Sequence, residues 1–400
     1  MTASLPAAQR GITLLVGVAA FLGPFTQTVY APILPELGSA LSTTPFLINL
    51  SISIFTLVLA WMQIVYGPLV DSRGRRPILL LGLAIYVAAS LGCFLSDSIE
   101  ALLVFRALQA VGIAAGAVVA VTVIGDCFEG PARGRAMGSF QMMVALGPVL
   151  GPVAGGFVGE HFDYHHVFLL LVVVGLAVLA LVAWRLRETR PAQVQARAFH
   201  PRQYLDILAD RQGLAIILLS FVQYYAFYNY LVFMPRVLDD VYGLSASEKG
   251  LVFLPLSLAV VLGTFSGGRI LAHSRARPML LATATLNALS LLLFLLVAEW
   301  SLAALVVAVT VFGLFLGLSL PVQTSLLMDL YTDNRATAVG AYNFFRFMGM
   351  ATGPVLGSWL FDGGGLGLLY GFGAAFFLLA VANAALRFRT AGRKATVVQD

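Results

Sequence analysis

The sequence predicts an all-α membrane protein whose twelve transmembrane helices form two parallel-repeated six-helix bundles. Three observations predict this fold class. First, 60% of the 400 residues are hydrophobic and only 11% are charged, with a mean hydropathy of +0.91, whereas a soluble domain carries roughly 25% charged residues. Second, twelve apolar segments have the ~20 residues that a bilayer core of ~30 Å requires. Third, glycines and prolines of the first half recur in the second.

The twelve apolar segments fall into two sets of six. The first set is 12–35, 46–70, 77–96, 99–125, 136–158 and 166–186, and the second is 212–235, 249–271, 278–297, 301–328, 337–360 and 367–387. The longest polar stretch separates the sets and is expected to be a cytoplasmic linker with a short amphipathic piece. The expected domains are an N-terminal bundle at 1–186, the linker at 187–211 and a C-terminal bundle at 212–400.

The positions of the cations indicate the orientation, because loops that stay in the cytoplasm keep Lys and Arg. With the N-terminus inside, all but four of the 24 cations lie on the inner side: Arg236 and Lys249 lie outside, and Arg106 and Arg346 lie within helices. We therefore expect a multi-pass inner-membrane protein with both termini cytoplasmic. The net charge of +5 reports this topology, and no basic soluble domain exists to bind nucleic acid.

The fifth segment carries helix breakers that recur in the eleventh. It contains Gly138, Gly147, Pro148, Gly151, Pro152 and Gly155, and a shift of 202 residues carries all of these except Pro148 onto Gly340, Gly349, Gly353, Pro354 and Gly357. A shift of 201 likewise carries Gly67, Pro77, Gly112 and Gly116 onto Gly268, Pro278, Gly313 and Gly317. Each half has six helices, so its ends share one side of the membrane and the halves repeat in parallel.

Three motifs make the chain resemble the major facilitator superfamily, and within it the twelve-helix drug:proton antiporter family. Residues 67–79, "GPLVDSRGRRPIL", are similar to the family loop G-x-L-x-D-x-x-G-R-R/K; "FRALQAVGIAAG" resembles R-x-x-Q-G-x-G, with Ala110 in place of a glycine; and the glycines of the fifth helix match the antiporter motif. "TVYAPILPEL" is similar to D-x-Y-x-P-x-x-P, but Thr28 stands where many members have an acid. The resemblance implies transport by alternating access.

The glycines of helices five and eleven are expected to let backbones approach closely in lipid, and the prolines to bend the helices. We expect two kinked, smooth helices, one per half, pressed against neighbours across or near the boundary between the halves, where they would seal the path against ion leak. The alternative is ordinary small-residue packing without an antiporter role.

The loop after helix two is the candidate gate. Asp71 is expected to face the positive N-terminal end of a helix from the other half, and Arg75 or Arg76 to pair with Asp126. By resemblance, such contacts hold the inner gate closed. The alternative is that the arginines only obey the positive-inside rule, although this does not explain Asp71. The residues assigned to gating and coupling are Gly67, Asp71, Gly74, Arg75, Arg76, Asp126 and Asp329, and Ala272 stands opposite Asp71 in the second half.

Arg106 and Arg346 are the two cations that lie away from the ends of their predicted spans. A charge near mid-bilayer costs ~2.5–3.5 kcal/mol on insertion scales, so each should face a watery cavity or hydrogen-bonded partners. Gln109 follows Arg106 by one turn and Asn343 precedes Arg346 by one turn, which gives both helices a polar face. The alternative is that each guanidinium ties helix backbones together without touching substrate.

Other polar and aromatic side chains within the spans are further candidates for substrate binding. Helix seven, "FVQYYAFYNYLVF", presents amphipathic rings that suit a pocket for lipophilic molecules, although interfacial belts use the same residues and the amides suit helix–helix hydrogen bonds equally well. The complete candidate set is Gln27, Tyr30, Asn49, Arg106, Gln109, Gln141, Tyr224, Tyr225, Tyr228, Asn229, Gln323, Asn343 and Arg346.

The predicted spans lack a mid-membrane carboxylate. All 19 acids fall in loops or at helix ends, and Asp71, Asp126 and Asp329 come nearest to the midplane. Proton antiport ordinarily uses a desolvated carboxylate with a raised pKa. We therefore hypothesise that Asp126 and the surrounding arginines handle protons near the inner face, and that a cavity with two arginines prefers neutral or anionic amphiphiles to permanent cations.

The sequence thus favours a secondary active transporter that exports lipophilic small molecules by proton antiport. No covalent chemistry, cofactor or structural metal is expected, and the expected partners are a small-molecule substrate, protons and the bilayer, with the chain acting as a monomer. A uniporter or symporter for metabolite uptake is the first alternative, and a transporter-like sensor or scaffold is the second. The histidines of the outer loop, His161, His165 and His166, fit a solvated loop better than a metal site.

Overall fold

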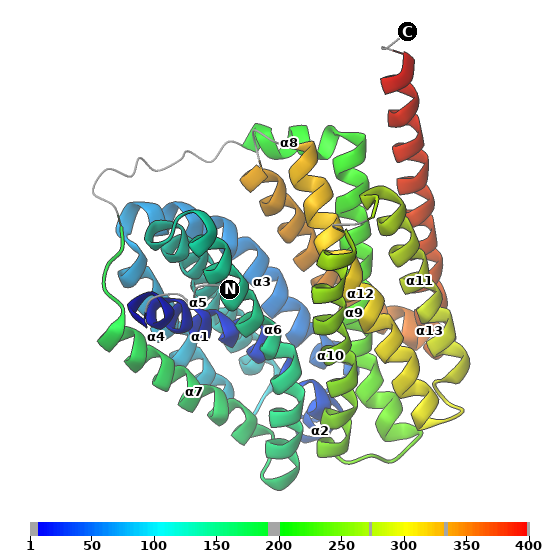
Figure 1. Ribbon diagram of the computed structural model, residues 1–400. Coiled ribbons are helices and arrows are strands. Elements are labelled where there is room, and N and C mark those ends of the chain that lie inside the picture. Colours follow the sequence, from blue (N-terminus) through cyan, green and yellow to red (C-terminus); the bar gives the residue numbers. More distant parts are fainter. Residues whose placement is uncertain (1–6, 191–200, 272–273, 332–334, 398–400) are drawn as a thin grey trace. The chain divides into compact units, whose positions relative to one another are not determined.

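The computed structural model describes residues 7–190, 201–271, 274–331 and 335–397, nearly all of them helical (Figure 1). The chain divides into two compact units. The first comprises residues 1–199 with 244–251, and the second comprises 200–243 with 252–400. Cys93 and Cys127 are free thiols, the first of them buried.

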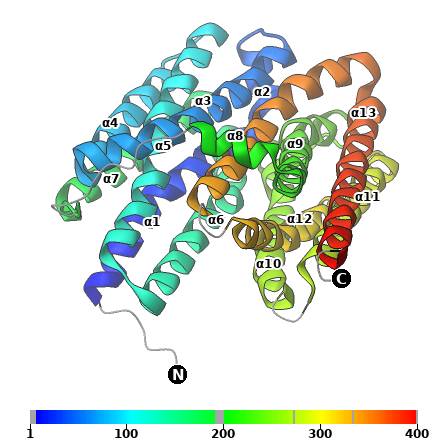
Figure 2. The same cartoon turned by 90° about the horizontal axis from the view of Figure 1, so that it is seen from above.

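The first unit contains the first six long helices of the chain. In chain order its elements are α1 (Ala7–Thr28), the 3₁₀ turn η1 (Ala31–Ile33), α2 (Leu34–Ala40), α3 (Pro45–Arg73), α4 (Arg75–Phe94), α5 (Ile99–Cys127), α6 (Gly130–His161) and α7 (Tyr164–Arg185). Side-chain caps from Thr44, Ser98 and Asp163 fix where α3, α5 and α7 begin, because each accepts an amide hydrogen left free at the helix start. Within the unit α4 contacts both α5 and α7, and α1 contacts α6 (Figure 2).

The second unit holds the remaining helices. They are α8 (Pro201–Ala209), α9 (Arg211–Asp240), α10 (Ala246–Leu271), α11 (Ala276–Val297), α12 (Leu302–Leu330) and α13 (Arg335–Val397), with the start of α10 counted in the first unit. The short helix α8 lies where the linker was expected to carry an amphipathic piece. α13 packs on α9 and α11, and α11 packs on α12.

α13 accounts for two of the twelve predicted spans. A straight helix of its 63 residues would extend about 95 Å, far more than a bilayer core. The helix is interrupted at Gly364 and Gly365, where Gly365 has φ +62°, a conformation that glycine adopts without strain. The interruption is confined to these two residues, and the two arms of the helix are the orange and red parts of α13 in Figure 1.

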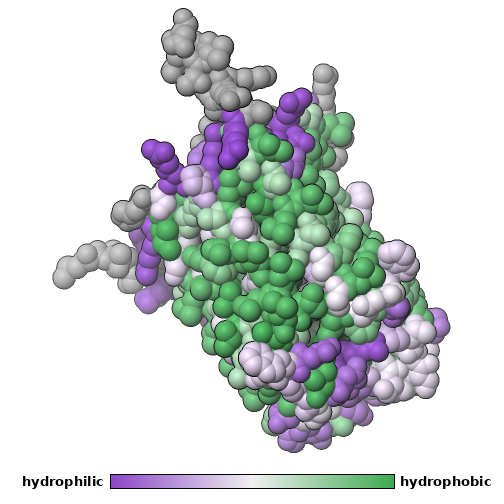
Figure 3. All heavy atoms as spheres, turned by 90° about the vertical axis from the view of Figure 1, so that its right-hand side faces the viewer, coloured by the Kyte–Doolittle hydropathy of each residue, from purple (hydrophilic) through white to green (hydrophobic). Residues whose placement is uncertain are grey.

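The exterior has the character of a membrane protein. Eleven helices of the described chain are long and apolar enough to cross a bilayer, and the last of them is the interrupted α13. Figure 3 shows one face on which apolar side chains cover the middle and hydrophilic side chains gather beyond both ends. Large apolar side chains are exposed along whole helices, for example Leu286, Leu289, Leu293 and Leu296 of α11. Such extended apolar faces are rare on soluble monomers, so the chain is a multi-pass integral membrane protein.

The glycines of α6 bring its backbone against α1. A Cβ atom at Gly147 would meet Pro24, and one at Gly155 would collide with the carbonyl of Val29. Gly151 lies in the same row, beside Thr28. The helix continues through both of its internal prolines. The row therefore seals α6 to the first helix of the same unit.

The duplicated glycines of α13 likewise bring its backbone against α9. A Cβ atom at Gly349 would collide with the carbonyl of Phe221, and Gly353 and Gly357 approach Tyr225 and Asn229. These contacts lie within the second unit, and the expectation of neighbours across or near the boundary between the halves stays a prediction. Close approach of glycine backbones is the usual way in which helices associate in lipid.

Candidate functional site

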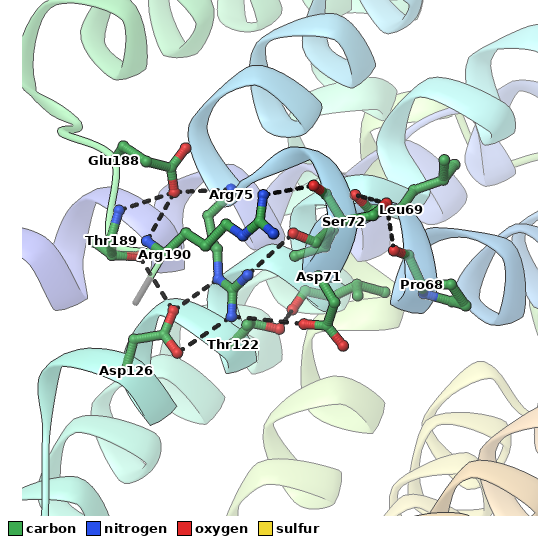
Figure 4. Close-up of polar contacts among 12 residues, drawn as sticks. Pro68, Leu69, Asp71, Ser72, Arg75, Thr122, Asp126, Glu188, Thr189 and Arg190 are labelled. Carbon is green, nitrogen blue, oxygen red and sulfur yellow. Dashed lines mark hydrogen bonds and ion pairs between the residues drawn. The ribbon is translucent and has the colours of Figure 1, made fainter. Parts of the chain in front are cut away.

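The turn between α3 and α4 is built around Arg75 (Figure 4). Its guanidinium is 2% exposed and donates from Nε to Asp126 Oδ2 at 2.8 Å. Nη1 donates to the carbonyl of Val70 at 3.1 Å, and Nη2 lies 3.5 Å from Asp71 Oδ1. The predicted pair with Asp126 is therefore made by Arg75, while Asp71 meets an arginine of its own unit. We call Asp71, Arg75, Asp126 and Glu188 the turn cluster.

Glu188, which sequence reasoning missed, caps α4. Its carboxylate accepts the backbone N–H groups of Arg75 at 3.0 Å and Arg76 at 3.1 Å, two of the amide hydrogens that a helix start leaves free. Burial by itself would raise the pKa of Glu188, but the backbone donors outweigh it and lower the pKa. Gly74 has φ +99°, and a side chain there would collide with Glu188. The sequence feature that could have indicated this cap is an acid directly after α7, in the segment interpreted as linker.

The segment after α7 has further bonds to the turn. Arg190 Nη1 donates to the carbonyl of Ser72 at 2.5 Å, and Thr189 Oγ1 donates to Asp126 Oδ2 at 3.3 Å. Arg76 Nη2 donates to the carbonyl of Ala183 at 2.9 Å. The turn cluster therefore joins the ends of α3, α4, α5 and α7. Of the other gating candidates, Asp329 is exposed at the end of α12, Gly67 has open space around it, and Ala272 lies outside the described residues.

Arg106 is sealed inside the first unit. Its side chain is 0% exposed, with Nη1 donating to Gln109 Oε1 at 2.5 Å and Nη2 to the Tyr30 hydroxyl at 3.1 Å. The guanidinium also lies over the rings of Tyr30 and Phe55, 4.5 and 4.1 Å from their centroids. The hydrogen bonds continue from Gln109 to another neutral side chain, since Gln109 Nε2 donates to Ser90 Oγ at 2.7 Å. The predicted polar face of Arg106 and Gln109 is present, and cation–π contacts stabilise a charge that pairs with no described carboxylate.

Arg346 is in a different environment in the second unit. Its half-buried guanidinium lies over Tyr224 and Phe347, 5.1 and 5.3 Å from the ring centroids. Its Nε is buried without a hydrogen-bond partner. Asn343, one turn earlier, does not bond to it within the described structure.

A buried network of neutral side chains lies in the second unit. Gln223 Nε2 donates to Asn287 Oδ1 at 3.0 Å and to Ser319 Oγ at 2.7 Å. Gln323 Nε2 donates to Gln223 Oε1 at 2.7 Å, and the Tyr342 hydroxyl donates to Gln323 Oε1 at 2.9 Å. The network thus links α9, α11, α12 and α13. Of these residues only Gln323 was a sequence candidate, and there it joins helices.

The remaining candidates lie in several different environments. Gln141 is exposed on α6, whereas the others are buried: Gln27, Asn49, Tyr224, Tyr225, Tyr228 and Asn229. The polar atoms Gln27 Nε2, Tyr225 Oη and Asn229 Oδ1 are buried without a hydrogen-bond partner. The ring of Tyr225 packs edge-on against Phe372 and Phe376 of α13. This set does not form one continuous site within a single unit.

Two of the three histidines near the α6–α7 turn lie beside carboxylates. His165 Nε2 lies 3.3 Å from Asp97 Oδ1, and His166 Nδ1 lies 2.7 Å from Asp163 Oδ1. Hydrogen bonds from the amide and ring of His166, together with the nearby imidazoles, lower the pKa of Asp163 against the opposing effect of burial. His161 stacks on Phe157. No group of three or more metal-ligating side chains occurs among the described residues.

Comparison with known proteins identifies the family. The model described as "Major Facilitator Superfamily" matches residues 16–271 and 216–399. The chain belongs to the Major Facilitator Superfamily. Among its relatives is the uncharacterised MFS-type transporter YdgK of Bacillus subtilis, 26% identical over 86% of this chain and 88% of that protein. A bicyclomycin resistance protein homolog of Haemophilus influenzae is 24% identical over 86% and 87%, and the multidrug transporter MdtP of B. subtilis is 23% identical over 83% and 71%.

Solved structures agree on the fold. A bacterial homolog of the human lysosomal transporter Spinster, inward-facing and occupied, has a TM-score of 0.78 at 19% identity and covers 97% of this chain and 98% of its own. The unoccupied form has a TM-score of 0.76 at 18% identity, with 96% coverage of both chains. The predicted major facilitator fold is confirmed, and the protein is a superfamily transporter.

Proposed function

We propose that this transporter exports lipophilic small molecules in exchange for protons, by alternating access, from a bacterial inner membrane with both termini cytoplasmic. The observation that carries the proposal is the glycine row of α6, which matches the antiporter motif and lies directly against the α1 backbone. Relatives named for bicyclomycin resistance and multidrug transport support the same reading. Metabolite uptake by a uniporter or symporter is the alternative.

Asp126 is the proposed proton carrier. Asp126 lies near the end of α5. Its side chain is only 13% exposed and is paired with the buried Arg75. Protonation would cancel the charge that holds Arg75 at 2.8 Å, and the Thr189 hydroxyl would lose its charged acceptor as well. A proton bound there would thus loosen the joint between α4 and α5, which couples proton binding to a change in the turn cluster.

The test is transport by the purified chain in liposomes. Neutral, anionic and cationic dyes are loaded with and without a pH gradient, and Asp126→Asn is compared with Asp206→Asn, an exposed aspartate on α8 as control. We expect gradient-driven dye movement in the wild type and the control, and at least a tenfold loss in Asp126→Asn with downhill exchange retained, a size typical of a lost proton-transfer group. Full pH-driven transport by Asp126→Asn would exclude Asp126 as carrier, and dye movement that ignores the gradient would favour a uniporter.

A further inference from the structure

Arg346 lies deep within its membrane span. It follows the start of α13, Arg335, by eleven residues, which is about 16 Å along the helix axis and about half of a ~30 Å hydrocarbon core. A guanidinium at this depth does not tolerate contact with lipid tails and faces a partner or an aqueous region. Because the side chain is only half-buried, part of it is open to such a region.

The protein gives this guanidinium aromatic faces but no acceptor. The Cζ atom of Arg346 lies over the rings of Tyr224 and Phe347, 5.1 and 5.3 Å from their centroids, and its Nε is buried without a hydrogen-bond partner. No hydrogen bond joins Arg346 to any other residue in the described part of the chain. Arg106 is the contrast, since two hydrogen bonds and two rings surround it and none of its surface is exposed. The Nε of Arg106 also lacks a partner, but both of its Nη atoms donate hydrogen bonds, whereas the Nη atoms of Arg346 donate to no residue in the described part of the chain.

The surroundings hold Arg346 in a defined place. Gly349, one turn later, lies against the carbonyl of Phe221, so the α13 backbone touches α9 just beside Tyr224. Tyr342, one turn earlier, donates to Gln323 at 2.9 Å and ties the same face of α13 to the neutral network. The guanidinium and the rings of Tyr224 and Phe347 are therefore preorganised, which reduces the entropy lost when a ligand binds.

We propose that Arg346, held against the rings of Tyr224 and Phe347, is an anion-binding subsite for the transported solute. The ligand class is a lipophilic organic acid, because the planar guanidinium fork matches the two oxygens of a carboxylate and the buried rings of Tyr224 and Phe347 make the surroundings of the charge apolar. A bound carboxylate neutralises the mid-membrane charge that the chain leaves without an acid. This inference rests on the proposed transport function and adds the substrate class to it.

The test compares two probes that differ only in charge, 2-naphthoate and 2-naphthamide, for binding to the purified full chain in detergent. We expect the wild type to prefer naphthoate by about tenfold or more, as charge-assisted hydrogen bonds imply. Arg346→Gln should abolish the preference, and Arg346→Lys, which keeps the charge without the fork, should retain part of it. The matched control is Arg236→Gln, which removes an arginine that also lies over a ring, Phe361, but has Asp240 as partner; it should leave the preference unchanged.

The outcomes separate this inference from the proposed function. Equal affinity of the wild type for both probes, or an unchanged preference in a folded Arg346→Gln protein with normal melting, overturns the subsite, while pH-driven movement of neutral dyes would leave export standing. An Arg346-dependent preference without any flux keeps the subsite and removes export. Anionic lipid offers similar chemistry, so the naphthoate titration is repeated with excess phosphatidylglycerol; displacement by the lipid would overturn the assignment to a solute, and its absence supports it.

Discussion

At the residue scale, Glu188 is the side chain whose removal has the clearest expected result. Glu188→Gln keeps the size but replaces one carboxylate acceptor by an amide donor, so α4 loses part of the cap that the amides of Arg75 and Arg76 now share. Losing a helix cap costs about 1 kcal/mol. We expect a lower melting temperature for the purified variant at pH 7, measured by the fluorescence of the intrinsic tryptophans.

The pH dependence of this effect follows from the lowered pKa of Glu188. A carboxylate whose pKa is lower in the folded than in the unfolded state stabilises the fold above its ordinary pKa, and this contribution is lost as pH falls through the folded pKa. The difference between wild type and variant should be full at pH 7 and shrink below about pH 4.5, the ordinary value. Glu129→Gln is the control, because Glu129 stands before α6 without a side-chain capping bond. A constant difference from pH 7 to pH 3 would contradict the capping role.

The sequence predicted some of these contacts and not others, for physical reasons. The Arg75–Asp126 pair could be predicted because opposite charges at the ends of neighbouring helices attract. Glu188 could not, because an acid in a polar stretch shows no preference for a helix start more than a hundred residues away. The role of Gln223 was not predicted for another reason. The sequence shows that an amide lies in a span, but only the packing of the helices shows that it bonds to Ser319 and Asn287.

At the element scale, the same glycine pattern serves different neighbours in the two units. The rows of α6 and α13 are equivalent, since each seals a helix to the first long helix of its own unit. The repeated glycines of α5 and α12 contact helices that are not equivalent. Gly112 of α5 meets Tyr86 of α4, whereas Gly313 of α12 meets Leu256 of α10. Repeat spacing therefore predicts where a smooth helix face lies, and the partner of that face is decided by packing.

Two alanine substitutions on α6 test the seal. Gly155→Ala places a methyl group into the carbonyl of Val29, whereas Gly138→Ala, on the same helix, meets nothing within 4 Å. Overpacking a closed contact costs about 1–3 kcal/mol, while alanine in place of an exposed helical glycine gains up to about 1 kcal/mol. We expect Gly155→Ala to lower the melting temperature and to reduce pH-driven transport, and Gly138→Ala to match or exceed the wild type. Equal melting temperatures would show that α6 and α1 separate easily.

At the scale of the whole molecule, composition and span length sufficed for the fold class, and contacts were needed for the assignment of one segment. Residues 244–251 were expected in the C-terminal bundle but cluster with the first unit. The buried Lys249 donates to Glu36 at 2.7 Å, and the amide of Ser247 donates to Glu160 at 2.8 Å. The cation count placed Lys249 outside the membrane, but a count of charges does not show which carboxylate it meets.

The parallel arrangement of the two six-span units predicts a labelling pattern. Single cysteines replace Asp97 and Glu129 in the first unit and Ser274 and Trp300 in the second, in a background where both native cysteines are serine. These positions are exposed loop residues. An even number of spans per unit keeps both units in the same orientation, and the positive-inside bias places the α5–α6 and α10–α11 loops in the cytoplasm. A membrane-impermeant maleimide should therefore label positions 97 and 300 in intact cells, and positions 129 and 274 only after permeabilisation. The reverse pattern in the second unit alone would mean that the units are inverted, and the reverse pattern in both would place the termini outside.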